Sequence, residues 1–159
     1  MYLPLGSTLV FTTYVENYGR FYEEGAAAEV PQVAIATPTL SYVPVGTDPA
    51  TELPEGDATR GEELFRGQTP GPDGAILACN SCHSLDGSVL VGPSMQGVAS
   101  RPLPEGYDSL ESYLHTSIVE PQVYKVPGFE SVNMPETFGQ RMDAQTLADV
   151  MAFLLTQTN

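Results

Sequence analysis

The chain has 159 residues, enough for one domain or for one domain with an arm. Twenty acidic and six basic side chains give a net charge of −14, which argues against unaided binding to nucleic acid or anionic lipid, because phosphate contacts need clustered Lys and Arg. No apolar run reaches the roughly 18 residues that read as a transmembrane helix. Fifteen glycines and fourteen prolines predict much irregular backbone.

Residues 1–56 carry one base, seven acids and six prolines, and we expect them to form an N-terminal arm. Apolar residues at helical spacing follow Ser7, a good N-cap residue, and predict a short helix: Val10, Tyr14, Tyr18 and Phe21. The prolines after residue 30 exclude a long helix and favour extended backbone. The apolar residues of the arm indicate contact with a surface, either that of the chain's own domain or that of a docking partner.

A sharper pattern begins at Asp57, which is placed to cap a helix that runs through Phe65. Gly67 is the first of several glycine and proline residues that end this helix. We therefore expect a second region, residues 57–159, to form the folded domain.

The two cysteines of the chain, Cys79 and Cys82, lie three positions apart, and His83 follows directly. The order Cys-x-x-Cys-His is the attachment motif of c-type haem. Two thiols at this spacing can each add to one vinyl group of the same porphyrin, and the next residue then offers an imidazole nitrogen to the iron. The motif therefore predicts one covalently bound haem c.

Three other interpretations compete with haem attachment. A thioredoxin-like motif lies between a strand and a helix, whereas glycines and a proline flank this one. A zinc site made of Cys79, Cys82, His83 and His115 would require two adjacent residues to close one tetrahedron. A structural disulfide would leave His83 without a role.

Two more helices are predicted after the motif. Asp108 and Glu111 resemble a capping box at the start of a helix that Pro121 stops. Asp143 is placed to cap the last helix, in which Met142 and Leu147 form a hydrophobic staple. The apolar stripe of that helix consists of Leu147, Val150, Met151 and Leu154. The expected fold is mainly α, with three to four helices joined by long loops around the haem.

The second iron ligand is sought among the remaining sulfur, imidazole and amine groups: Met95, Met134, Met142, Met151, His115 and Lys125. Met95 would have to cross to the opposite haem face within twelve residues of His83. The methionines at 142 and 151 are expected in the core, the histidine lies mid-helix, and the lysine would need desolvation. Met134 lies in a loop stiffened by Pro135, where a thioether can reach iron without distorting a helix. His83 and Met134 are the predicted axial ligands.

These features together resemble class I mono-haem c-type cytochromes. The resemblance rests on residues 57–65, on the haem motif, on residues 92–101 and on Met134-Pro135, and it covers residues 57–159. It implies a cytochrome c-like fold in which Gly61 permits a close approach to the last helix.

The same resemblance implies roles for the residues around the haem. Phe65 meets the last helix and lies near the haem edge. The Pro93 carbonyl accepts the proton on the far nitrogen of His83. Met95 lies against the ring, and Arg101 approaches a propionate.

Residues 117–135 resemble the cytochrome domains attached to respiratory oxidases and the mono-haem subunits of quinol-oxidising complexes such as alternative complex III. Residues 57–159 hold thirteen acids and five bases and lack the lysine ring of many soluble carriers, so repulsion would slow docking on acidic oxidases.

Met/His ligation leaves iron without an open position, which predicts electron transfer instead of catalysis. We expect a subunit of a membrane-associated respiratory or photosynthetic electron-transport complex, whose redox partners are other subunits. A freely diffusing acidic cytochrome is the alternative, and a haem enzyme or gas sensor is a third hypothesis.

Thioether attachment takes place outside the cytoplasmic membrane in bacteria, which predicts a periplasmic or extracytoplasmic location. The first residues show no Lys- or Arg-led apolar segment typical of a signal peptide. We therefore expect either that the N-terminus is processed or incomplete or that the start of the sequence is misassigned.

Overall fold

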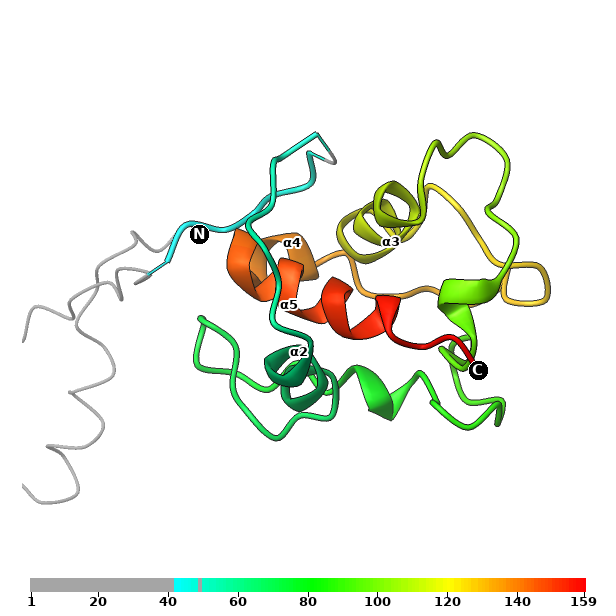
Figure 1. The fold of residues 1–159 in the computed structure, drawn as a ribbon, viewed down its shortest axis with the longest axis horizontal. Coiled ribbons are helices and arrows are strands. Elements are labelled where there is room, and N and C mark those ends of the chain that lie inside the picture. Colours follow the sequence, from blue (N-terminus) through cyan, green and yellow to red (C-terminus); the bar gives the residue numbers. More distant parts are fainter. Residues whose placement is uncertain (1–41, 49) are drawn as a thin grey trace, which may run out of the picture. The chain divides into compact units, whose positions relative to one another are not determined.

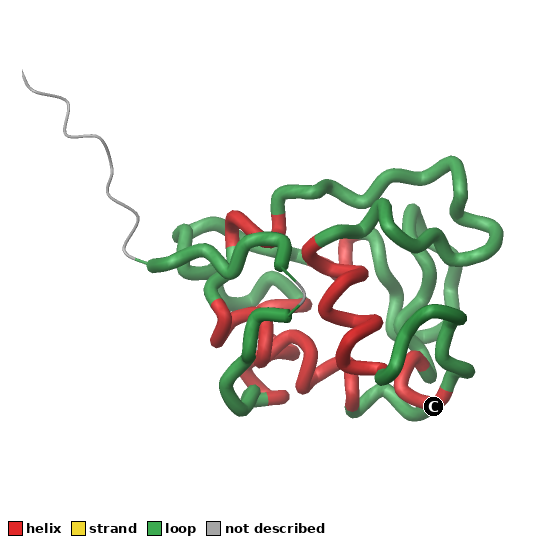
Figure 2. The backbone as a smooth tube through the Cα atoms, turned by 90° about the horizontal axis from the view of Figure 1, so that it is seen from above, coloured by secondary structure: helices red, strands yellow, loops and turns green. Residues whose placement is uncertain are grey.

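The computed structural model describes residues 42–48 and 50–159, whose regular secondary structure is helical, without a strand, and whose helices are joined by long loops (Figures 1 and 2). The α-helices of this part are α2 (Ala58–Phe65), α3 (Leu110–Val119), α4 (Phe138–Arg141) and α5 (Ala144–Leu155). Two short 3-10 helices, η1 (Cys79–Ser81) and η2 (Val98–Ser100), interrupt the long loops. The mainly α prediction is confirmed for these residues. The helix predicted between residues 7 and 21 lies outside the described ranges.

All described residues belong to the compact unit that contains these helices. It includes residues 42–48 and 50–56, which we call the strap and which the sequence assigned to the arm. The N–H of Val45 donates a hydrogen bond of 2.8 Å to the carbonyl oxygen of Met142, the C-cap residue of α4. The N–H of Gly46 donates one of 2.8 Å to the carbonyl oxygen of Gly139 within α4. The side chain of Val45 packs against the core. The strap therefore lies against α4.

Helix α5 lies between α2 and α3 (Figure 1), and α2 makes its main helix contact with α5. The contact is close because Gly61 faces the backbone of α5: a Cβ at this position would lie 1.9 Å from the carbonyl oxygen of Asp149. One turn later, the rings of Phe65 and Phe153 lie 5.4 Å apart, centroid to centroid. The expectation that Gly61 and Phe65 meet the last helix is confirmed.

A buried carboxylate also joins α5 to the start of α2. The side chain of Asp149 is 1% exposed and accepts hydrogen bonds of 2.8 Å from the Asp57 N–H and from Gln145 Nε2. Its other oxygen pairs with the guanidinium of Arg60. Burial of a charge is tolerated when partners of this kind surround it.

Two of the three caps predicted within the described residues are confirmed. The Asp57 carboxylate accepts from the N–H groups of Thr59 and Arg60, and Asp143 accepts from Thr146 at 2.8 Å.

The predicted capping box of Asp108 and Glu111 is wrong. Ser109 caps α3, and its hydroxyl accepts from the Ser112 N–H at 3.0 Å. Serine offers the same acceptor one residue later, where the backbone is still extended (φ −150°, ψ 160°), so the helix begins after it.

The core is formed mainly by buried residues of α2, α3 and α5. Met142 and Leu147, the predicted staple, are 1% and 0% exposed, and Met151 is buried beside them, as expected. The largest contributors from the helices are Leu64, Phe65, Leu114, Val119, Val150, Phe153 and Leu154. On one side this core opens into a cavity.

Candidate functional site

The cavity lies between the Cys-x-x-Cys-His segment, α3, α5 and the loop at residues 121–135. It holds about 1200 Å³ free of protein atoms when its mouth onto solvent is included. All eight residues predicted for the site line it: Phe65, Cys79, Cys82, His83, Pro93, Met95, Arg101 and Met134. The fold therefore brings together residues from separate stretches of sequence.

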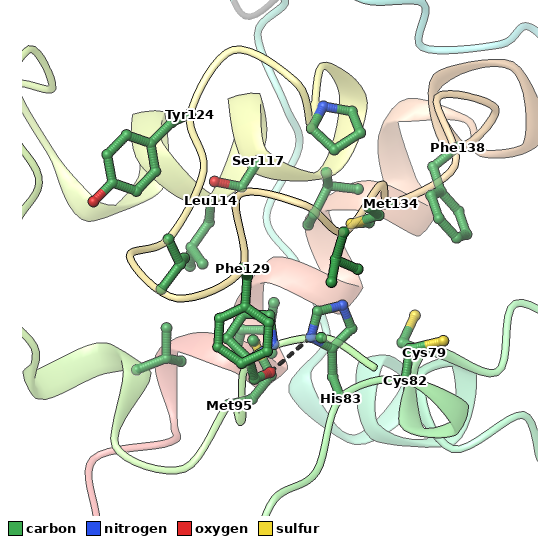
Figure 3. A pocket seen from close by; sticks show the side chains of 18 of the residues that line it. Cys79, Cys82, His83, Met95, Leu114, Ser117, Tyr124, Phe129, Met134 and Phe138 are labelled. Atoms are coloured by element: carbon green, nitrogen blue, oxygen red, sulfur yellow. Dashed lines mark hydrogen bonds between the residues drawn. The ribbon is translucent and has the colours of Figure 1, made fainter. Parts of the chain in front are cut away.

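The two thiols lie together at one end of the cavity (Figure 3). Cys79 opens η1, and its carbonyl oxygen accepts from the N–H groups of Cys82 and His83 at 3.1 and 2.9 Å. This single tight turn sets both sulfurs and the imidazole on one side of the backbone. No disulfide joins the two cysteines, and burial raises the pKa of the Cys79 thiol to about 11.

The imidazole of His83 is held in place by backbone groups. Its Nδ1 lies 2.8 Å from the Pro93 carbonyl oxygen, which confirms the contact that the resemblance implied. The ring also lies flush against Gly92, where a Cβ would come within 2.5 Å of Cε1. Burial lowers the pKa of His83, although the hydrogen bond to Pro93 acts in the opposite direction. A neutral ring that donates through Nδ1 keeps its other nitrogen available as a ligand, and that nitrogen is turned towards Met134 in Figure 3.

Met95 and Arg101 belong to the same wall as His83. The N–H of Met95 donates to the Ser84 carbonyl at 2.8 Å, which ties the backbone of this methionine to the residue that follows His83. The Arg101 guanidinium donates to the carbonyl oxygens of Ser94 and Gln96 at 2.6 and 2.5 Å. Its contact with a propionate remains a prediction.

Met134 projects from the opposite wall (Figure 3). The other candidate ligands are placed less favourably. Met151 is buried in the core and does not line the cavity, whereas Met142 lines it but is only 1% exposed. Lys125 lines the cavity, and its ammonium donates to the Val132 carbonyl and to Asn133 Oδ1.

His115 belongs to a different surface of α3. It is 3% exposed and does not line the cavity, and neither ring nitrogen has a hydrogen-bond partner within the described residues. Burial lowers the pKa of His115, and the nearby carboxylates of Asp48 and Glu120 act to raise it. No group of three or more His, Cys, Asp or Glu residues in the described ranges is arranged to hold a metal ion, so the zinc hypothesis gains no support.

A pH effect on stability follows from the lowered pKa of His115. Below about pH 6.5, the unfolded chain takes up a proton on this imidazole before the folded chain does. The free energy of unfolding is therefore expected to fall as the pH drops from the unfolded pKa towards the lower folded pKa. The variant His115→Leu removes the titrating group and should show a flatter dependence.

Denaturant unfolding of both proteins between about pH 7 and about pH 5 measures this difference. His83 is present in both proteins, so the difference between the two slopes isolates His115. Equal slopes would contradict the assignment.

The cavity chemistry fits a haem. Two thiols lie at one end, an imidazole and a thioether come from opposite walls, and apolar side chains form most of the remaining surface. These apolar residues include Leu114, Ile118, Val126, Phe129, Phe138 and Leu154. Arg101 adds a cation suited to a carboxylate group.

The sequence did not single out Gly92 or the pair of tyrosine rings, Tyr113 and Tyr124, that line the cavity. Gly92 directly precedes Pro93, whose contact with His83 was expected. That contact brings the backbone at position 92 close to the imidazole, so it could have indicated that a residue without a side chain is needed at this position. The rings of Tyr113 and Tyr124 line the cavity and meet edge to face at 5.7 Å. No spacing in the sequence marks this pair.

No protein-family model matches the chain, and a comparison with curated proteins finds no similar sequence. Within the described ranges, none of the helices has the length and apolar character needed to cross a membrane.

Proposed function

We propose that this chain is an electron-transfer protein that carries one haem c, attached through Cys79 and Cys82, with His83 and Met134 as axial ligands. The observation that carries the proposal is the convergence of the Cys-x-x-Cys-His segment and the Met134 thioether on one apolar cavity. When bound, the haem supplies a one-electron iron couple.

The residues of the chain have distinct roles in this proposal. The thiols would hold the porphyrin, and the Pro93 carbonyl sets the tautomer and orientation of His83. Met134 would be the second residue that holds the iron, which would leave no position for a substrate and would give the group a raised reduction potential. The apolar walls keep water away and lower the local dielectric constant. This arrangement favours a carrier over a haem enzyme or gas sensor.

The proposal includes a place for the protein: a subunit of a membrane-associated respiratory or photosynthetic complex, on the periplasmic or extracytoplasmic side. Residues 57–159 carry eight more acids than bases, which suits a fixed position better than steered docking on an acidic surface. Three consecutive exposed apolar residues, the last of which lines the cavity, support contact with another protein: Val89, Leu90 and Val91 are 80%, 43% and 58% exposed.

Absorption spectroscopy and membrane fractionation of the native protein test the two parts. For haem ligation, we expect reversible one-electron reduction, a weak sulfur-to-iron band near the red edge in the ferric form, and no carbon monoxide binding at neutral pH. For the subunit, we expect purification together with membrane proteins. Carbon monoxide binding would favour the enzyme or sensor hypothesis, and recovery only as a soluble monomer would favour a freely diffusing carrier.

A further inference from the structure

The segment that carries Met134, residues 121–135, forms one wall of the cavity and is called here the methionine loop. It is built from successive turns, with backbone bonds from Phe129 to Val126 and from Val132 to Phe129. No backbone–backbone hydrogen bond joins the outgoing limb, residues 120–126, to the returning limb, residues 132–136. The backbone alone therefore does not close this loop.

Side chains of the outgoing limb make the connection instead. Gln122 Nε2 donates to the carbonyl oxygen of Met134 at 2.8 Å. The Lys125 ammonium donates to the carbonyl oxygen of Val132 and, at 2.9 Å, to Asn133 Oδ1. Three consecutive residues that end at the methionine are thus each held by a side chain from across the loop.

The charge of Lys125 strengthens this connection. None of the ion pairs in the described part of the chain includes Lys125, so its donors serve neutral oxygens of the methionine loop. Hydrogen bonds from an ionised donor are about twice as strong as those between neutral groups. The bonds to Val132 and Met134 are also partly buried, which limits competition from water.

The two axial residues are therefore held in different ways. Backbone groups of Gly92 and Pro93 fix the ring of His83, as described above. The segment that carries Met134 is instead bonded by two removable side chains, those of Gln122 and Lys125. Because loop opening would carry the thioether away from the cavity, any group that favours the closed loop also favours sulfur ligation.

We propose that Gln122 and Lys125 are positioning residues that clamp the methionine loop and hold the Met134 thioether in the axial position. This inference rests on the proposed function and adds the device that keeps the second ligand in place. Without the clamp, the loop opens more often, and an outside ligand reaches the iron more quickly.

Displacement of the sulfur by added imidazole tests the clamp in the ferric holoprotein. The rate at which the sulfur-to-iron band near the red edge disappears gives the rate of displacement. Lys125→Ala is expected to speed displacement roughly ten- to hundredfold, because the free energy of a hydrogen bond from a charged donor corresponds to a change of this size in an equilibrium constant. Gln122→Ala removes a neutral donor and is expected to speed displacement less. Lys125→Arg keeps the charge and the donors and should restore much of the slow rate.

Arg66→Ala is the matched control, because it removes the same charge from an exposed ion pair with Glu62 on α2. Hydrogen exchange provides a second readout: amides of the methionine loop should exchange faster in Lys125→Ala, while those of α5 keep their wild-type rates. Wild-type displacement rates in both alanine variants would overturn the clamp alone. Equally fast displacement in Arg66→Ala would also overturn it, and so would faster hydrogen exchange of the α5 amides in Lys125→Ala, because either result would indicate that the whole fold has loosened. Absence of the sulfur band from the unaltered protein would overturn the ligand assignment and the clamp together.

Discussion

Replacing both cysteines with serine is expected to abolish covalent attachment of the haem. The unaltered protein should keep its pigment in acidified organic solvent after denaturation, and its mass should exceed that of the polypeptide by one haem. In the Cys79→Ser, Cys82→Ser double variant, the pigment should be extracted completely and the mass should fall to that of the polypeptide. The reason is geometric: both sulfurs lie at one end of the cavity, beside His83.

Asn80→Ala is the control for the double variant, because this exposed residue lies between the cysteines and contributes no thiol. It should keep its haem. Stability should fall in the double variant, because a haem that binds only reversibly can dissociate, and its stabilising effect then grows only with the logarithm of its free concentration. If the unaltered protein already released its pigment into acid solvent, the attachment and the function built on it would be wrong.

Replacing Met134 with leucine is expected to open the axial position opposite His83. The red-edge sulfur band should disappear, carbon monoxide should bind the reduced protein, and the reduction potential should fall. Loss of a thioether ligand is a large change, because axial ligands set haem potentials over a span of about 0.8 V. Leucine has a similar volume, so the cavity wall should persist.

Met95→Leu is the matched control, since it makes the same exchange in the same cavity but on the histidine side. It should keep the sulfur band and stay closed to carbon monoxide. Spectra of the two ferric variants, with potentiometric titration, make the comparison. Loss of the band in Met95→Leu with retention in Met134→Leu would reverse the ligand assignment.

Local chemistry explains what was predictable from the sequence. The Cys-x-x-Cys-His spacing needs one turn of chain, and caps such as Asp57 and Asp143 act on N–H groups two or three residues away. The α3 cap was missed by one residue because Asp108 and Ser109 both offer an oxygen acceptor, and only the backbone angles decide between them.

Contacts between distant or irregular segments could not be predicted in the same way. Asp149 meets Asp57 and Arg60 across 92 and 89 positions, and no periodicity links them. The bond from Gln122 to Met134 joins two parts of a loop whose path depends on the whole cavity wall. The types of side chain in the sequence were enough to predict the ligands, whereas the hydrogen-bond partners that position these ligands could be identified only from the fold.

The strap determines where the molecule can be cut. A fragment that starts at residue 57 would remove the donors that Val45 and Gly46 offer to the region of α4, together with the apolar side chains of Val45 and Leu53. It would also remove the carbonyl of Glu55 that accepts from Gln145. A minimal module intended for an electrode or a fusion protein therefore has to begin no later than Tyr42, whose hydroxyl already reaches the carbonyl of Gln140.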